Sequence, residues 1–159
     1  MRSNGARDGF TLVELVAVIG MLAILGVIAG PRFFEGGTET RSDLFRAELV
    51  AGLRYAQKLA VATGCPTQVS IAAASYAITQ LAGCAGSSYT LAVVDPSTGD
   101  AGYARPAPGG VALASTTNPL RFDALGRALD SSGVVTGATL NVGTRTITVI
   151  GETGLARAS

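Results

Sequence analysis

The longest apolar stretch of the chain, residues 10–30, places the strongest constraint on its structure. Among these 21 residues Glu14 is the only ionisable one. As an α-helix the stretch would be about 32 Å long at about 1.5 Å per residue, which matches a hydrocarbon core of about 30 Å. Arg2 and Arg7 precede it, and basic residues before an apolar segment hold the N-terminus in the cytoplasm. The sequence therefore predicts a single transmembrane helix.

A cleavable secretory signal is the alternative interpretation of this stretch. Such a signal has a shorter apolar core that ends in a small-residue cleavage site, and residues 28–30, Ile-Ala-Gly, have that composition. The core is longer than this interpretation expects, and it carries Glu14 near its start. Because an acidic group in hydrocarbon costs about 2.5–3.5 kcal/mol, it normally has a partner or a purpose. Glu14 is therefore a candidate functional residue.

The composition excludes several classes of catalytic and metal site. The chain has no His, so it contains no His-based triad, no His general base and no His-ligated metal site. It also lacks a G-x-S-x-G nucleophile motif. We expect a protein that is not an enzyme and that holds neither a cofactor nor a metal. The formal net charge of +1, without a long run of one sign, does not favour a nucleic-acid partner.

Cys65 and Cys84 are the only cysteines. Their spacing is not that of a CxxC redox motif, and two thiolates without His are too few for a tetrahedral zinc site. A signal for export would place this part of the chain where disulfides persist. A disulfide between them is the leading interpretation, and two unpaired buried thiols are the alternative.

Downstream of the apolar stretch, the pattern indicates a second helix and then a β-rich head. Pro31 either kinks the first helix or ends it at the membrane surface. Between residues 38 and 63, apolar residues recur at three- and four-residue steps, which is typical of an amphipathic helix on a core. We expect an α+β protein with a leader at residues 1–9, a membrane helix at 10–30, a linker and amphipathic helix at 31–63, and a head at 64–159.

The head is predicted to be mainly antiparallel β. Short apolar runs between turn residues indicate a hairpin at residues 68–71 and 76–81 and further strands at residues 89–94, 111–114, 120–123, 127–129, 138–142 and 145–150. Residues 102–110 contain Pro106 and Pro108, which have no N–H group to donate to a strand ladder. We expect this segment to be an exposed loop.

The junction between the leader and the apolar stretch reads Gly9-Phe10-Thr11-Leu12-Val13-Glu14. It resembles the processing site of type IV prepilins and type II secretion pseudopilins. The resemblance implies that a prepilin peptidase cleaves after Gly9 and methylates the new amino terminus of Phe10. It also implies that Glu14 pairs in a fibre with the amino terminus of a neighbouring subunit, so that two costly buried charges compensate each other. The partners would be other pilin subunits, the inner membrane and an assembly platform, with the head in the periplasm.

Two downstream segments narrow the resemblance. Residues 53–61, LRYAQKLAV, and residues 120–127, LRFDALGR, are similar to segments of the GspH/FimT group of minor pseudopilins and pilins. The first segment, with a cysteine shortly after it, also resembles MshC-type minor pilins of mannose-sensitive haemagglutinin pili. The implied fold is that of type IV pilins, in which a long N-terminal helix continues into an amphipathic part packed on a mainly antiparallel head.

The resemblance implies a minor structural subunit that initiates or caps a type II secretion pseudopilus or a type IV pilus. The alternative is a binding pilin at the fibre tip that recognises DNA or a secreted substrate. FimT-type pilins that take up DNA carry a basic C-terminal stretch, whereas residues 154–159 here contain only Arg157 as a base. Arg145 and Arg157 could still form a small DNA-contacting patch, and a salt-dependent DNA shift would separate the two functions.

The processing motif makes a testable prediction about the mature chain. In a strain with active prepilin peptidase, we expect the membrane-purified protein to begin at Phe10 and to carry one added methyl group, because the basic leader ends directly before the apolar stretch. Mass spectrometry of the intact protein measures both changes. Recovery of a chain that still begins at Met1 would contradict the prediction.

Overall fold

The computed structural model describes residues 11–159, apart from the side chains of residues 25–36. The chain divides into two compact units, one ending at Gly37 and the other covering Thr38–Ser159. The predicted leader and Phe10 lie outside the described residues. The second unit is the head in the description that follows.

One long helix, α1 (Leu12–Thr63), accounts for all the helical residues described before the first strand. It begins after Thr11, whose side-chain oxygen accepts a hydrogen bond from Glu14 N–H at 3.3 Å, as the N-cap of a helix does. It continues through Pro31, so the helix does not stop there. Among the described side chains, no stretch of helix is long and apolar enough to span a membrane. Phe10 and the side chains of residues 25–30, which belong to the predicted span, lie outside them.

The part of α1 that belongs to the head buries one face. Phe45 is 3% exposed, and Leu49, Leu53, Ala56 and Ala60 are fully buried. These positions follow each other at steps of three or four residues, so they share one side of the helix. The amphipathic pattern seen in the sequence is confirmed.

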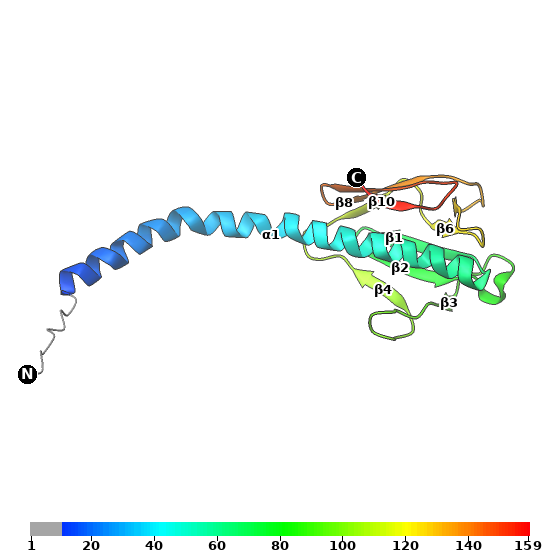
Figure 1. Cartoon of the computed structure of the whole chain (residues 1–159), viewed down its shortest axis with the longest axis horizontal. Coiled ribbons are helices and arrows are strands. Elements are labelled where there is room, and N and C mark those ends of the chain that lie inside the picture. The colour runs from blue at the N-terminus through cyan, green and yellow to red at the C-terminus, as the bar shows by residue number, and fades with distance from the viewer. Residues whose placement is uncertain (1–10) are drawn as a thin grey trace, which may run out of the picture. The chain divides into compact units, whose positions relative to one another are not determined.

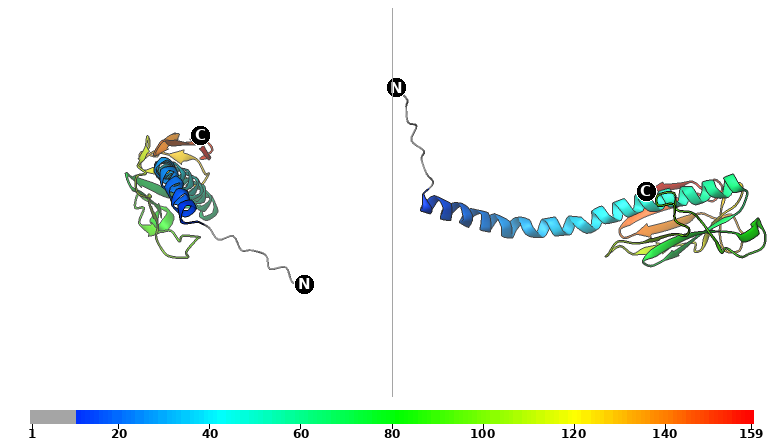
Figure 2. Two further views of the ribbon diagram at one scale, coloured as in Figure 1. Left: turned by 90° about the vertical axis from the view of Figure 1, so that its left-hand side faces the viewer. Right: turned by 90° about the horizontal axis from the view of Figure 1, so that it is seen from below.

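Two antiparallel sheets lie on one side of this part of α1 (Figures 1 and 2). Their strands are β1 (Thr67–Ala72), β2 (Ser75–Gln80), β3 (Leu91–Ala92), β4 (Tyr103–Pro106), β5 (Leu113–Ser115), β6 (Leu120–Phe122), β7 (Ala128–Leu129), β8 (Ala138–Val142), β9 (Arg145–Val149) and β10 (Ala156–Ala158). Sheet one has the order β3-β2-β1-β6-β7, with β4 also paired to β2, and sheet two has the order β10-β9-β8-β5. The prediction of a mainly antiparallel head is confirmed.

The register of the strands turns alternate side chains toward α1. In the first hairpin Val69 pairs with Ile78, and in sheet two Leu140 pairs with Ile147. All four side chains are at most 1% exposed and belong to one apolar cluster that also contains the buried face of α1. Because side chains of a strand alternate between its faces, each sheet presents an apolar inner face to the helix. The head therefore has one core, shared by the helix and both sheets.

The prediction of a loop at residues 102–110 was wrong for its first half. Residues Tyr103–Pro106 form β4, which pairs antiparallel with β2. Ala107 N–H donates to Ala74 O at 2.8 Å. Because the hydrogen-bonding direction alternates along an antiparallel strand, the backbone nitrogen and carbonyl of the preceding residue, Pro106, point away from β2. A proline is tolerated at such an outward position of an edge strand, because no ladder donor is needed there.

No pattern in the sequence predicts β10. The predicted strand at residues 89–94 is too long, since only β3 (Leu91–Ala92) is paired there as a strand. β10 has only three residues, Ala-Arg-Ala, and follows a turn. Strands this short and rich in alanine lack the β-branched and aromatic residues on which a sequence-based assignment depends.

Two glycines let the loops after β6 and β9 meet at α1. Gln57 Nε2 on α1 donates to Gly126 O at 3.0 Å and to Thr153 O at 2.6 Å. Gly154 has a φ of +61°, and a Cβ atom there would overlap the carbonyl oxygen of Gly126. The junction therefore needs glycine at position 154 for both its conformation and its close approach.

This junction can be tested with alanine. We expect Gly154→Ala to lower the free energy of unfolding by about 3 kcal/mol, because a left-handed conformation and a backbone overlap both oppose the added methyl group. Gly133→Ala is a matched control, since Gly133 also has a positive φ, +84°, but open space around its Cβ position. Thermal unfolding of the full chain in detergent, followed by circular dichroism, measures the difference. Equal losses for the two variants would contradict the role of the close approach.

Candidate functional site

Glu14 lies in the first turn of α1 and is exposed to solvent. The spacing Thr11-Leu12-Val13-Glu14 is that of a capping box, in which an N-cap threonine and a glutamate three residues later satisfy free N–H groups at a helix start. One half of this arrangement, the bond from Glu14 N–H to Thr11 Oγ1, is present. The T-x-x-E spacing is the sequence signal for this local role of Thr11, which the predictions above do not include. Gly9 and Phe10 lie outside the described residues.

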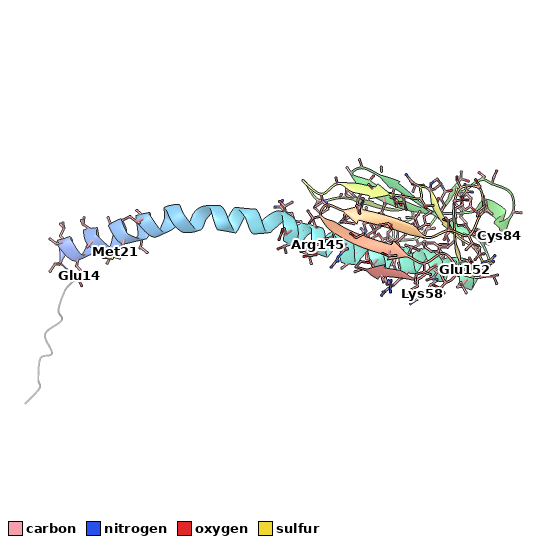
Figure 3. All side chains as sticks on the ribbon, turned by 90° about the horizontal axis from the view of Figure 1, so that it is seen from above. Glu14, Met21, Lys58, Cys84, Arg145 and Glu152 are labelled. Atoms are coloured by element: carbon pink, nitrogen blue, oxygen red, sulfur yellow. A yellow bond between two sulfur atoms is a disulfide. The ribbon has the colours of Figure 1, made fainter. Side chains whose placement is uncertain are left out.

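The described apolar side chains around Glu14 are all exposed. Their exposed fractions run from 46% at Val18 to 78% at Leu12, and the set comprises Leu12, Val13, Leu15, Val16, Val18, Ile19, Met21, Leu22 and Ile24. Figure 3 shows Glu14 and Met21 on this part of the helix. Contiguous apolar surface of this kind marks an interaction with a membrane or with other proteins.

Cys65 and Cys84 form a disulfide, as predicted, with their Cα atoms 4.6 Å apart. Cys65 follows the end of α1, and Cys84 ends the short 3-10 helix η1 (Ala82–Cys84) after β2. Gln80 holds the same corner, because its Nε2 atom donates to Thr63 Oγ1 at 2.6 Å and to Cys65 O at 3.3 Å. With a sequence separation of 19 residues, the chain-entropy model attributes about 3 kcal/mol of stability to the disulfide.

The structure does not bring Arg145 and Arg157 together. Side chains alternate between the two faces along a strand. Arg157 pairs with Thr148 and lies on the same face of sheet two as Thr148. Arg145 lies on the other face, the face of the buried Ile147. Arg145 also lies against α1, with its Nε atom 2.9 Å from Asp43 Oδ1 and Nη2 donating to Asp43 Oδ2 at 3.1 Å. The two arginines thus lie on opposite faces, and one of them is ion-paired.

Two arginines of α1 bind the backbone of the C-terminal segment. Arg54 Nε donates to Ala156 O at 3.1 Å, and Arg46 Nη1 donates to Ser159 O at 2.9 Å. The partners of both arginines lie about a hundred residues further along the chain, so no local signal in the sequence predicts these bonds.

A further polar cluster attaches the loop between β3 and β4 to α1. Arg105 Nη2 lies 2.6 Å from Asp95 Oδ2, and its Nε atom lies 3.0 Å from Glu48 Oε1, within ion-pair distance but not aligned as a hydrogen bond. Hydrogen bonds from the hydroxyl and the backbone N–H of Ser97 hold the pKa of Asp95 below its ordinary value, and Arg105 adds to this effect. Asp95 therefore stays ionised, and the cluster fixes the loop.

The buried Tyr76 is held neutral by its surroundings. Burial raises the pKa of its phenol well above the ordinary value, and the neighbouring hydroxyl of Tyr103, 3.5 Å away, adds to the shift. Gly52 makes room for both rings, since a Cβ atom there would lie 2.9 Å from the Tyr76 hydroxyl. This arrangement serves packing against α1. The described residues enclose no pocket and hold no group of three or more His, Cys, Asp or Glu side chains that could bind a metal ion.

Comparisons with known proteins support the fold. No protein-family model matches the chain, and no curated protein matches its sequence. Among solved structures, it is similar to the type IV minor pilin FimU of Pseudomonas aeruginosa, with a TM-score of 0.52 and 13% identity over 79% of this chain and 90% of that one. At this identity the similarity shows the fold alone. The chain has a type IV pilin-like fold.

The separation of the two arginines predicts weak DNA binding. We expect the full chain in non-ionic detergent to bind duplex DNA no more tightly than its Arg145→Ala/Arg157→Ala variant, because affinity depends on how many phosphates a protein neutralises at once. A binding titration at low and at near-physiological salt measures this. Micromolar binding that weakens steeply with salt and is lost in the double variant would contradict the prediction.

Proposed function

We propose that this chain is a minor pilin or pseudopilin, a membrane-anchored structural subunit of a type IV pilus or of a type II secretion pseudopilus. The observation that carries the proposal is the combination of a pilin-like fold with an exposed apolar helix start that contains Glu14. A soluble head on a helix whose described N-terminal side chains are apolar and uncovered is suited to assembly through that helix.

Processing and anchoring follow from the same segment. A prepilin peptidase removes residues 1–9, methylates Phe10 and leaves residues 10–30 in the inner membrane with the head in the periplasm. The support is the motif Gly9-Phe10-Thr11-Leu12-Val13-Glu14 and the basic leader before it. The disulfide between Cys65 and Cys84 fits an oxidising compartment such as the periplasm.

Glu14 sets the register between subunits in the fibre. In a mature chain the positive amino terminus of one subunit and the carboxylate of Glu14 in its neighbour would neutralise each other in an apolar environment. The nearest bases on either side of Glu14 in the sequence are Arg7 and Arg32, whose side chains are not among those described. No ion pair involving Glu14 is present among the described side chains. A partner from another subunit is therefore the simplest compensation for its charge.

A minor role, in initiating or capping the fibre, is supported by two similarities. Residues 53–61 and 120–127 resemble the GspH/FimT group, and the structural neighbour is itself described as a minor pilin. The residues of these segments have structural roles here, since Gln57 and Gly126 form the junction of α1 with the loops. Their arrangement is suited to holding the head together.

The charge-pair proposal is tested with Glu14→Ala. We expect the variant to insert into the membrane as before, because the helix becomes more apolar, but to be incorporated into fibres more than about tenfold less, since an unpaired amino terminus would be buried. Immunoblots of sheared fibres and of the membrane fraction measure the two steps separately. Glu152→Ala, which removes an exposed acid of the head, is the control. Normal amounts of Glu14→Ala in sheared fibres would refute the pairing.

A further inference from the structure

The outer edge of β10 is covered by side chains of α1. β10 is the end strand of sheet two and pairs with β9 on its inner side. On the outer side, Arg54 donates to Ala156 O. Just past the end of the strand, Arg46 donates to Ser159 O. Figure 3 shows β10, the last red strand, lying beside α1. These contacts lie wholly within the head.

The hydrogen bonds identify which backbone groups face outward. Leu155 O accepts from Ile150 N–H at 3.1 Å, and Ser159 N–H donates to Thr146 O at 3.1 Å. Because the hydrogen-bonding direction alternates along an antiparallel strand, residues 155, 157 and 159 face β9, and Ala156 and Ala158 face away from it. Ala156 O is thus an acceptor that an added strand would use, and Arg54 occupies it.

An uncovered β10 would be a template for another strand. Edge strands without proline, bulges or covering elements pair readily with a second chain, and the side chains of Ala156 and Ala158 are too small to prevent approach. A second copy of β10 fits this edge, because an antiparallel pair around a two-fold axis brings identical surfaces together. With the axis at Arg157, Ala156 of each copy pairs with Ala158 of the other, and the two Arg157 side chains lie directly opposite each other.

We propose that Arg54 blocks pairing of β10 with a second copy of itself, that Arg46 supports this block by holding the residue after the strand against α1, and that Arg157 opposes the same pairing by like-charge repulsion. This inference rests on the proposed function in one respect: subunits of a fibre are held at high local concentration, where an open sheet edge would compete with correct assembly. With this edge blocked, subunits would associate through the apolar start of α1 and not through their sheets. It also gives Arg157 a role that does not involve a ligand.

The test uses Arg157→Cys as a reporter in the full chain in detergent. Cys65 and Cys84 are bonded to each other, so the new thiol is the free one. Two such thiols facing each other across the paired strands would be close enough for a disulfide. We expect little disulfide-linked dimer from Arg157→Cys alone under mild oxidation. We expect about tenfold more when Arg46→Ala and Arg54→Ala are added, because Arg54→Ala frees the outward acceptor Ala156 O and Arg46→Ala releases the residue after the strand from α1.

Lys58→Ala supplies the matched control, because Lys58 is an exposed cation on α1 one helical turn after Arg54. Its loss should leave the dimer yield at the level of Arg157→Cys alone. Arg46→Met with Arg54→Met is a second variant that keeps apolar stems for packing and should also raise the yield. Unchanged yields in both double variants would overturn the proposal. The proposal would also be overturned if the dimer yield rose equally with the reporter cysteine placed at the exposed Ala51 on α1, because such a rise would indicate random collision of the chains. Fibre incorporation does not enter this measurement, so its outcome is separable from that of Glu14→Ala.

Discussion

The structure depends on the burial of one face of α1 in the head. Leu49 and Leu53 are completely buried there, and full burial of a leucine side chain contributes about 1.5–3 kcal/mol. Ala56 and Ala60 complete the face and let the sheets approach the helix closely. Each sheet has a single apolar face, and neither could keep that face from water without the helix. The helix therefore unites two sheets, whose strands are short, into one domain.

Around this core, side chains of α1 hold loops and the short C-terminal strand in place. Gln57 binds two loops, Arg54 binds the C-terminal strand, and Glu48 contributes to the cluster that holds the loop before β4. Their apolar neighbours on the helix bury the core, so a single element supplies both packing and the polar contacts at its margins. Buried and half-buried carbonyl groups in loops need such donors, and α1 is the element long enough to reach all of them.

The sequence predicted the elements whose signals are local. The amphipathic period of the helix and the strand at residues 138–142 agree with the structure, because burial follows directly from the pattern of apolar residues. β4 was missed because its proline occupies an outward edge position, and β10 because three small residues carry no pattern. The bonds of Arg46 and Arg54 join residues about a hundred positions apart, so only the fold reveals them. The processing residues Gly9 and Phe10 stay predictions.

The described parts of α1 differ in a way that bears on assembly. In the head, apolar and polar residues separate onto two faces, whereas the described side chains from Leu12 to Ile24 are apolar on every face except for Glu14 and the small residues. A helix that is apolar all round is stable only when lipid or protein surrounds it. A single carboxylate in such a helix costs free energy in either environment. Glu14 would lower the stability of such a helix on its own, and the proposed assembly, in which a positive group reaches Glu14 from another chain, would offset that cost. The covered edge of β10 is consistent with association through the start of α1, because it removes strand pairing as a competing mode of association from the head.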